Sequence, residues 1–188
     1  MKKLLVSLMA VSVIALTGCA EKGTATGTEN AENTPAATAA VEDGKFDFNS
    51  AISNMKICGH NVSLPCAFKE LGEGFTFDTP IKDEVNNYMF TTFRYNGTDI
   101  GTIYLELRDD EKYEESQIVS MILNSKSEAE INGVTMESSE KDIKNALGED
   151  FNKNDYNIDY GNENDGLVRI LMNSVTNTPM SVTIVIPR

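Results

Sequence analysis

The stretch Leu71-Gly72-Glu73-Gly74-Phe75 is nearly repeated later in the chain as Leu147-Gly148-Glu149-Asp150-Phe151. Each copy follows a short segment with helical spacing of apolar residues, and each is preceded by an Ile-x-Gly triplet, at residues 57–59 and 131–133. Self-similarity of this kind is the sequence sign of a tandem repeat. The sequence therefore predicts two copies of one small module.

Each module is predicted to have an α+β fold, the first over residues 46–125 and the second over residues 126–188. A short hairpin, turning at Asn132-Gly133 in the second copy, and a helix precede an antiparallel meander of strands. The helices are expected to pack on one sheet face, because apolar and polar residues alternate along the strands. The predicted strands are Tyr88–Tyr95, Ile100–Arg108 and Gln117–Leu123 in the first module, and Tyr156–Tyr160, Leu167–Asn173 and Met180–Ile186 in the second.

The two predicted helices have start and stop signals of their own. The first is expected to begin near Pro65 and to stop at Gly72, since proline is favoured in the first helical turn and glycine just after the last. The second is expected to be capped by Ser138 or Ser139 and to stop at Gly148.

Residues 1–18 have the pattern of a bacterial lipoprotein signal. Two lysines precede an apolar run over residues 4–16, and Leu16-Thr17-Gly18-Cys19 resembles the lipobox at which such signals are cleaved. The resemblance implies cleavage before Cys19, lipidation of its thiol and an extracytoplasmic protein anchored to the cell membrane by lipid. The alternative is an ordinary secretory signal with an incidental cysteine. The apolar run is shorter than the roughly 17–25 residues of a membrane-spanning helix.

Residues 19–45, which begin with the lipidated cysteine, are predicted to form a disordered tether. They are rich in Ala, Thr, Glu, Asn and Gly and have almost no large apolar side chains, so they cannot offset their ordering entropy by burial. The whole chain has a formal net charge of −13 at pH 7. Such a charge repels phosphate groups, which argues against a nucleic-acid partner.

Cys58 and Cys66 are the two cysteines beyond the lipobox. An extracytoplasmic compartment permits a disulfide between them. The alternative is a pair of small, buried, free thiols. The sequence alone does not decide between the two.

The Ile-x-Gly, helix and Leu-Gly-x-x pattern at residues 57–75 and 131–151 resembles a family of bacterial envelope lipoproteins built from tandem copies of such a module followed by antiparallel strands. More distantly, it is similar to the β-lactamase-inhibitor-protein-like fold and to the small outer-membrane-assembly lipoproteins. The resemblance implies a protein-docking surface on the solvated face of the sheet. It assigns no individual functional residue, because the matched residues end helices and form turns.

Tyr88, Arg94 and Tyr104 are the candidate residues of such a docking face, since Tyr and Arg are enriched at the hot spots of protein interfaces. The alternative is that the tyrosines form cross-strand pairs that only stabilise the sheet. The leading hypothesis is therefore a non-enzymatic lipoprotein of the cell envelope that binds or scaffolds an envelope or secreted protein. The second hypothesis is a lipoprotein that binds a small molecule or an ion.

The sequence offers no catalytic constellation and no cofactor motif, so neither an enzyme nor a cofactor is predicted. His60 is the only histidine, and no serine lies in a Gly-x-Ser-x-Gly elbow. Asp155, Asn157 and Asp159 alternate like the first ligands of a calcium-binding EF-hand loop, but the sixth position holds Tyr160 instead of glycine. The same alternation is typical of a strand with one polar face, so a calcium site is the lesser interpretation.

Overall fold

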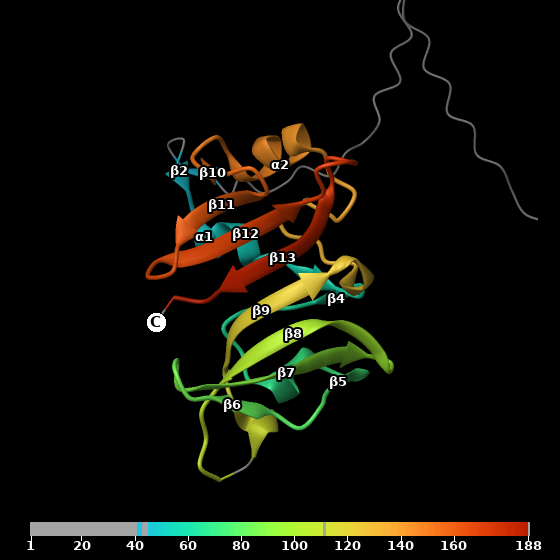
Figure 1. Cartoon of the computed structure of the whole chain (residues 1–188), viewed down its shortest axis with the longest axis vertical. Coiled ribbons are helices and arrows are strands. Elements are labelled where there is room, and N and C mark those ends of the chain that lie inside the picture. The colour runs from blue at the N-terminus through green and yellow to red at the C-terminus, as the bar shows by residue number, and fades with distance from the viewer. Residues whose placement is uncertain (1–40, 43–44, 111, 188) are drawn as a thin grey trace, which may run out of the picture. The chain divides into compact units, whose positions relative to one another are not determined.

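The computed structural model describes residues 41–42, 45–110 and 112–187. Nine strands join in one sheet, in which neighbours follow the order β10-β11-β12-β13-β9-β8-β7-β5 and β6 also pairs with β7 (Figure 1). These strands are β5 (Phe75–Phe77), β6 (Ile81–Asp83), β7 (Tyr88–Tyr95), β8 (Thr98–Glu106), β9 (Ile118–Asn124), β10 (Asn152–Lys153), β11 (Asn157–Asn162), β12 (Gly166–Met172) and β13 (Pro179–Val185). The pairs are antiparallel throughout.

The remaining elements are short. Two small ladders pair β1 with β2 and β3 with β4. The elements are β1 (Val41–Glu42), β2 (Lys45–Phe46), α1 (Phe48–Ile52), β3 (Lys56–Ile57), β4 (His60–Asn61), α2 (Glu140–Leu147) and the 3-10 turns η1 (Phe68–Leu71), η2 (Tyr113–Glu115) and η3 (Ser125–Ser127).

The predicted α+β fold is wrong. Strands make up 44% of the structure and helix only 16%, and the two α-helices have five and eight residues. The helix expected after Pro65 is a single 3-10 turn of four residues. Ala67, just before the turn, is held in a bridge to Gln117, and Gly72, with φ 100°, ends the turn. Helices this short do not form a layer over nine strands. The fold is a β-rich one, built on one large antiparallel sheet.

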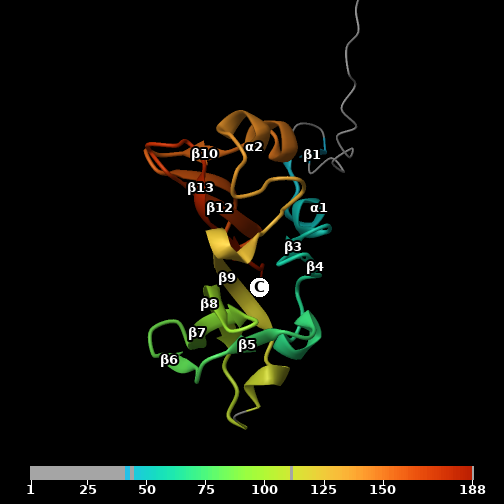
Figure 2. The same cartoon turned by 90° about the vertical axis from the view of Figure 1, so that its right-hand side faces the viewer.

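The core lies between the sheet and the segment that precedes it. In Figure 2, α1, β3 and β4 lie on one side of the sheet. Apolar side chains of this segment, such as Phe48, Met55 and Ile57, belong to the same buried cluster as Phe93 and Ile103 of the sheet. The sheet face that contacts this segment is called the inner face here, and the opposite one the outer face.

Alternation along the strands separates the two faces. On β7, Met89, Thr91 and Phe93 are buried, whereas the residues between them are only partly buried. The same period of two is seen on β13, where Val182 and Ile184 are buried. This is the pattern of a sheet with one packed face and one solvated face.

The predicted first and second modules contribute to one continuous sheet. The join is the antiparallel pair β9–β13, in which Asn124 lies opposite Ser181. On the inner side, Lys56 and Glu130 exchange both main-chain hydrogen bonds, at 2.9 and 3.0 Å, and their side chains form an ion pair at 3.1 Å. The halves are therefore linked on both sides of the core.

The local signals of the second copy are confirmed. Ile131 and Val134 pair across the Asn132-Gly133 turn. Ser139 caps α2: its hydroxyl accepts from the Asp142 N–H, while the Asp142 carboxylate accepts from the Ser139 N–H at 3.0 Å. These two hydrogen bonds satisfy helix N–H groups that have no partner within the helix. Gly148 follows the last helical residue, as predicted.

The N-terminal predictions lie largely outside the described residues. The signal over residues 1–18, the lipidation site Cys19 and the tether as far as residue 40 are not described. At the end of the predicted tether, β1 and β2 pair with each other. In the described ranges, no helix has the length and apolarity that a bilayer crossing needs.

Candidate functional site

The structure places Tyr88, Arg94 and Tyr104 on the outer face of β7 and β8. Tyr104 lies directly opposite Phe90, with ring centroids 6.1 Å apart, and Tyr88 lies opposite Glu106. All three predicted residues are partly buried. The period of two along β7 puts Tyr88, Phe90 and Arg94 on the same side, so the three residues share one surface.

Arg94 is held in place by Asp78, in the connection between β5 and β6. Its Nε and Nη2 donate to the two carboxylate oxygens at 3.1 and 2.9 Å. This bidentate contact lowers the pKa of Asp78 below its ordinary value, with the hydrogen bond from Arg94 as the largest cause. The Arg94 side chain is therefore fixed, and two of its guanidinium N–H groups are already bonded to Asp78.

The outer face of the sheet has different side chains at its two ends. On β11 and β12, Arg169 donates from Nε and Nη2 to the Asp159 carboxylate at 2.9 and 2.8 Å. Thr183 of β13 lies beside Arg169, and Ile122 of β9 lies beside Thr183. The aromatic residues of the outer face thus gather on β7 and β8, and an ion pair occupies the other end. We call Tyr88, Phe90, Arg94 and Tyr104 the aromatic patch.

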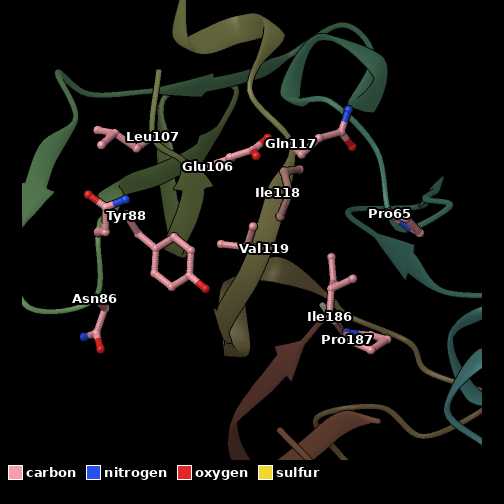
Figure 3. Close-up of a pocket in the computed structure, with 11 residues that line it drawn as sticks. Pro65, Asn86, Tyr88, Glu106, Leu107, Gln117, Ile118, Val119, Ile186 and Pro187 are labelled. Carbon is pink, nitrogen blue, oxygen red and sulfur yellow. The ribbon is translucent and has the colours of Figure 1, made fainter. Parts of the chain in front are cut away.

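A groove opens where β7 begins and where β8 and β13 end, beside the start of β9. We call it the strand-end groove; its volume is about 650 Å³. Figure 3 shows the Tyr88 ring reaching into this space from one side, and Val119 and Ile186 facing it from others. The residues that line the groove are Pro65, Asn86, Asn87, Tyr88, Glu106, Leu107, Gln117, Ile118, Val119, Ile186 and Pro187.

A β-bulge shapes one wall of the strand-end groove. The register between β8 and β9 shifts there: Tyr104 pairs with Ser120, but Leu105 pairs with Ile118, which leaves Val119 without an opposite residue. Val119 instead accepts from the Ile186 N–H at 3.0 Å through its carbonyl oxygen. A bulge of this kind re-aims a side chain next to a site. Here it turns Val119 toward the groove.

The turn between β6 and β7 forms the rim of the groove. The Asp83 carboxylate accepts from the main-chain N–H groups of Val85 and Asn86 at 3.0 and 3.2 Å, and from Asn86 Nδ2 at 2.8 Å. These bonds lower the pKa of Asp83. The rim is therefore ordered by its own hydrogen bonds.

One of the three residues of the calcium candidate, Asp159, is bonded to an arginine. Asp159 is the acceptor of the Arg169 fork. Asn157 and Asp159 lie on β11, while Asp155 precedes that strand and is exposed. The described residues also contain no group of three or more His, Cys, Asp or Glu side chains placed to hold a metal ion. Asn157 and Asp159 thus lie on one face of a strand, two residues apart.

Cys58 and Cys66 are free thiols in this structure. Cys66 is buried, and burial raises the pKa of its thiol to about 11. Cys58 is partly buried and lies 3.3 Å from the carbonyl oxygen of Ser127. Its pKa is also raised, mainly by burial.

His60 has a structural setting that the sequence did not indicate. Its Nε2 lies 2.8 Å from the Tyr95 hydroxyl, and its ring meets those of Phe75 and Tyr95 edge-on. These contacts tie β4 to the sheet. His60 therefore packs the inner layer against the sheet.

Sequence reasoning missed Phe90, Asp78 and most of the groove. The alternation on β7 carried a signal for Phe90, since it lies two residues from Tyr88. The groove has no such signal, because Pro65, Val119 and Ile186 come from distant segments. Only the fold brings them together.

Comparisons of the chain with protein-family models, with curated proteins and with solved structures found no match. The residues of the chain itself therefore carry the functional proposal.

Proposed function

We propose that this chain is a non-enzymatic lipoprotein of the bacterial cell envelope that binds another protein through the outer face of its sheet. The observation that carries the proposal is the aromatic patch: three aromatic side chains and an ordered arginine on two adjacent strands. Tyr, Phe and Arg are the residue types enriched at the cores of protein interfaces. A sheet holds them rigidly, so little side-chain entropy is lost on binding.

The lipobox-like stretch Leu16-Thr17-Gly18-Cys19 supports the envelope location. A lipid anchor at Cys19 keeps the domain at a membrane surface, where its partner is an envelope or secreted protein. Lipidation is tested by feeding cells an alkyne-tagged fatty acid and following the tag on the full chain. The tag and the membrane association should both be lost in the Cys19→Ser variant; retention of either contradicts the anchor.

The docking face is tested by photo-crosslinking in cells of the native bacterium. The full chain carries a benzoyl-phenylalanine in place of Tyr104, and the cross-linked products are identified by mass spectrometry. We expect one protein partner, whose cross-linked yield falls at least several-fold when Phe90→Ala is added, because Phe90 belongs to the same patch and lies directly opposite position 104.

The control places the same photo-reactive residue at Val175, which is 87% exposed in the connection between β12 and β13, away from the aromatic patch. Identical products at both positions would mean non-specific contact. Absence of any product at Tyr104 would also remove the docking face.

A second candidate function, the binding of a small molecule, is favoured by the strand-end groove. Its volume of about 650 Å³ falls within the roughly 300–1,000 Å³ of ligand pockets. This candidate uses a different part of the molecule from the aromatic patch, apart from Tyr88, which belongs to both.

A further inference from the structure

The charge in the strand-end groove comes from a single carboxylate. Among its eleven lining residues, Glu106 is the only one that is charged at neutral pH, and none is Lys, Arg or His. Asn86, Asn87 and Gln117 add neutral amide groups, and Tyr88 adds a phenol. An anionic ligand would meet repulsion without a counter-charge, whereas a cation meets Glu106.

The cation closest to Glu106 in the sequence, Arg108, lies just beyond the end of β8 and is engaged elsewhere. Arg108 donates from Nε and Nη2 to Asp110 at 2.9 and 2.7 Å, and its Nη2 lies 3.7 Å from Glu115. Both acids raise the pKa of Arg108, together with a smaller contribution from Glu106. One guanidinium thus serves two closer carboxylates, and the negative charge of Glu106 remains available to the groove.

Glu106 and Tyr88 lie side by side at the mouth of the groove. They are directly opposite each other in the β7–β8 register, so their side chains emerge on the same face. In Figure 3 the Glu106 side chain extends toward Gln117, and the Tyr88 ring lies on another side of Val119. A carboxylate beside an aromatic ring is a favourable setting for an ammonium group, which binds the first by charge and the second through the face of the ring.

Six of the eleven lining residues are apolar. Leu107, Ile118, Val119 and Ile186 form its walls, together with prolines 65 and 187. Ile118 and Ile186 belong to the buried core, and the Val119 carbonyl is fixed by the Ile186 N–H. The walls are therefore preformed, and an apolar group placed against them is removed from water without reorganising the protein.

We infer that the strand-end groove binds a small organic cation, whose ammonium group lies between Glu106 and Tyr88 and whose apolar body packs on Val119 and Ile186. This inference rests on the second candidate function and names its ligand class. It does not depend on the aromatic patch as a protein-docking face, so the cross-linking result at Tyr104 and the ligand result below can fail separately.

The test compares two fluorinated probes of the same shape and opposite charge. The full chain in phosphatidylcholine nanodiscs is titrated with para-fluorobenzylammonium or with para-fluorobenzoate, and binding is followed by fluorine NMR against empty nanodiscs. The salt concentration is about 0.15 M, where a Debye length of about 8 Å screens distant charges. We expect the cation to bind at least ~10-fold more tightly than the anion, because only the ammonium group can donate a hydrogen bond to the charged carboxylate of Glu106.

Three variants locate the binding. Glu106→Gln should lower the affinity for para-fluorobenzylammonium by about 10-fold, as expected for the loss of one charge-assisted contact. Glu106→Lys should reverse the preference, so that para-fluorobenzoate binds better. Glu73→Gln changes the net charge equally but lies outside the groove, and it should leave the affinity unchanged. The inference is overturned if neither probe binds at millimolar concentration, if both bind alike, or if Glu73→Gln acts like Glu106→Gln.

Discussion

Replacing Phe93 by alanine tests which face of the sheet forms the core. Phe93 is fully buried, stacks on Phe75 with ring centroids 5.5 Å apart and meets Phe68 edge-on at 6.1 Å. Burying a phenylalanine removes on the order of 150–200 Å² from water. At about 25 cal/mol per Å², this area corresponds to about 4–5 kcal/mol, close to the ~3–5 kcal/mol typical of Phe→Ala changes in protein cores. We therefore expect Phe93→Ala to lower the free energy of unfolding by about 4 kcal/mol.

Phe90→Ala is the matched control on the other face of the same strand. Phe90 is partly buried, and its ring neighbour is Tyr104 at 6.1 Å. We expect a cost of about 1 kcal/mol, the scale of a cross-strand pair. Both variants are measured by urea unfolding followed by circular dichroism, with the slopes compared to verify equal exposed area. Equal costs, or a larger cost for Phe90→Ala, would refute the assignment of the inner and outer faces.

Three further predictions concern single positions. Asn132→Ala removes the 2.7 Å hydrogen bond from Nδ2 to the Ala146 carbonyl, and thermal melting should show a loss of about 1–3 kcal/mol; unchanged stability would contradict a role for this bond. Gly101→Ala places a methyl group on the main-chain oxygen of β9, so urea unfolding should show a loss of ~2 kcal/mol or more, and a neutral result would mean that the strands are farther apart. The thiol of Cys66 has its pKa raised from 9.0 to about 11, so its contribution to stability is complete below pH 9 and falls as the pH rises toward 11. Thermal melting near pH 10.5 should show that the free energy of unfolding has fallen by an amount on the order of 1–2 kcal/mol, and Cys66→Val should abolish this loss. An identical pH profile in the variant would argue against Cys66 as the cause of the loss.

Signals that act over a few residues predicted local structure well. The run of aromatic and β-branched residues over Tyr88–Tyr95 predicted β7 with both of its ends. The turn at Asn132-Gly133, the cap at Ser139 and the stop at Gly148 were also predicted. In each case the hydrogen-bond partners lie within about one helical turn or one hairpin, so the sequence contains the whole interaction.

The fold class was mispredicted where a distant partner overrode a local preference. The segment from Pro65 to Gly72 has a helix start and a helix stop, but its residue Ala67 pairs with Gln117. Tertiary contacts of this kind outweigh helix propensities, which amount to less than about 1 kcal/mol per residue. The strands β5 and β10 were missed because runs of three and two residues show no periodicity.

The candidate site was predictable only in part, for the same reason. Period two along one strand is enough to put Tyr88 and Arg94 on a common face. It does not reveal that Asp78 occupies the Arg94 fork. Nor does it reveal the bulge that turns Val119 toward the groove, because a bulge is defined by the register of two strands and not by either one alone.

The pairing of β9 with β13 has a consequence for the newly made chain. During synthesis of the polypeptide, one edge of β9 stays unpaired until β13 has been made, because Asn124 of β9 pairs with Ser181 of β13. Until then, the unpaired N–H and C=O groups of β9 are exposed, and strands of other molecules can pair with them. Contacts this remote in sequence also slow folding. The interval between the emergence of these two strands is therefore the period in which the protein is most exposed to aggregation and most dependent on chaperones.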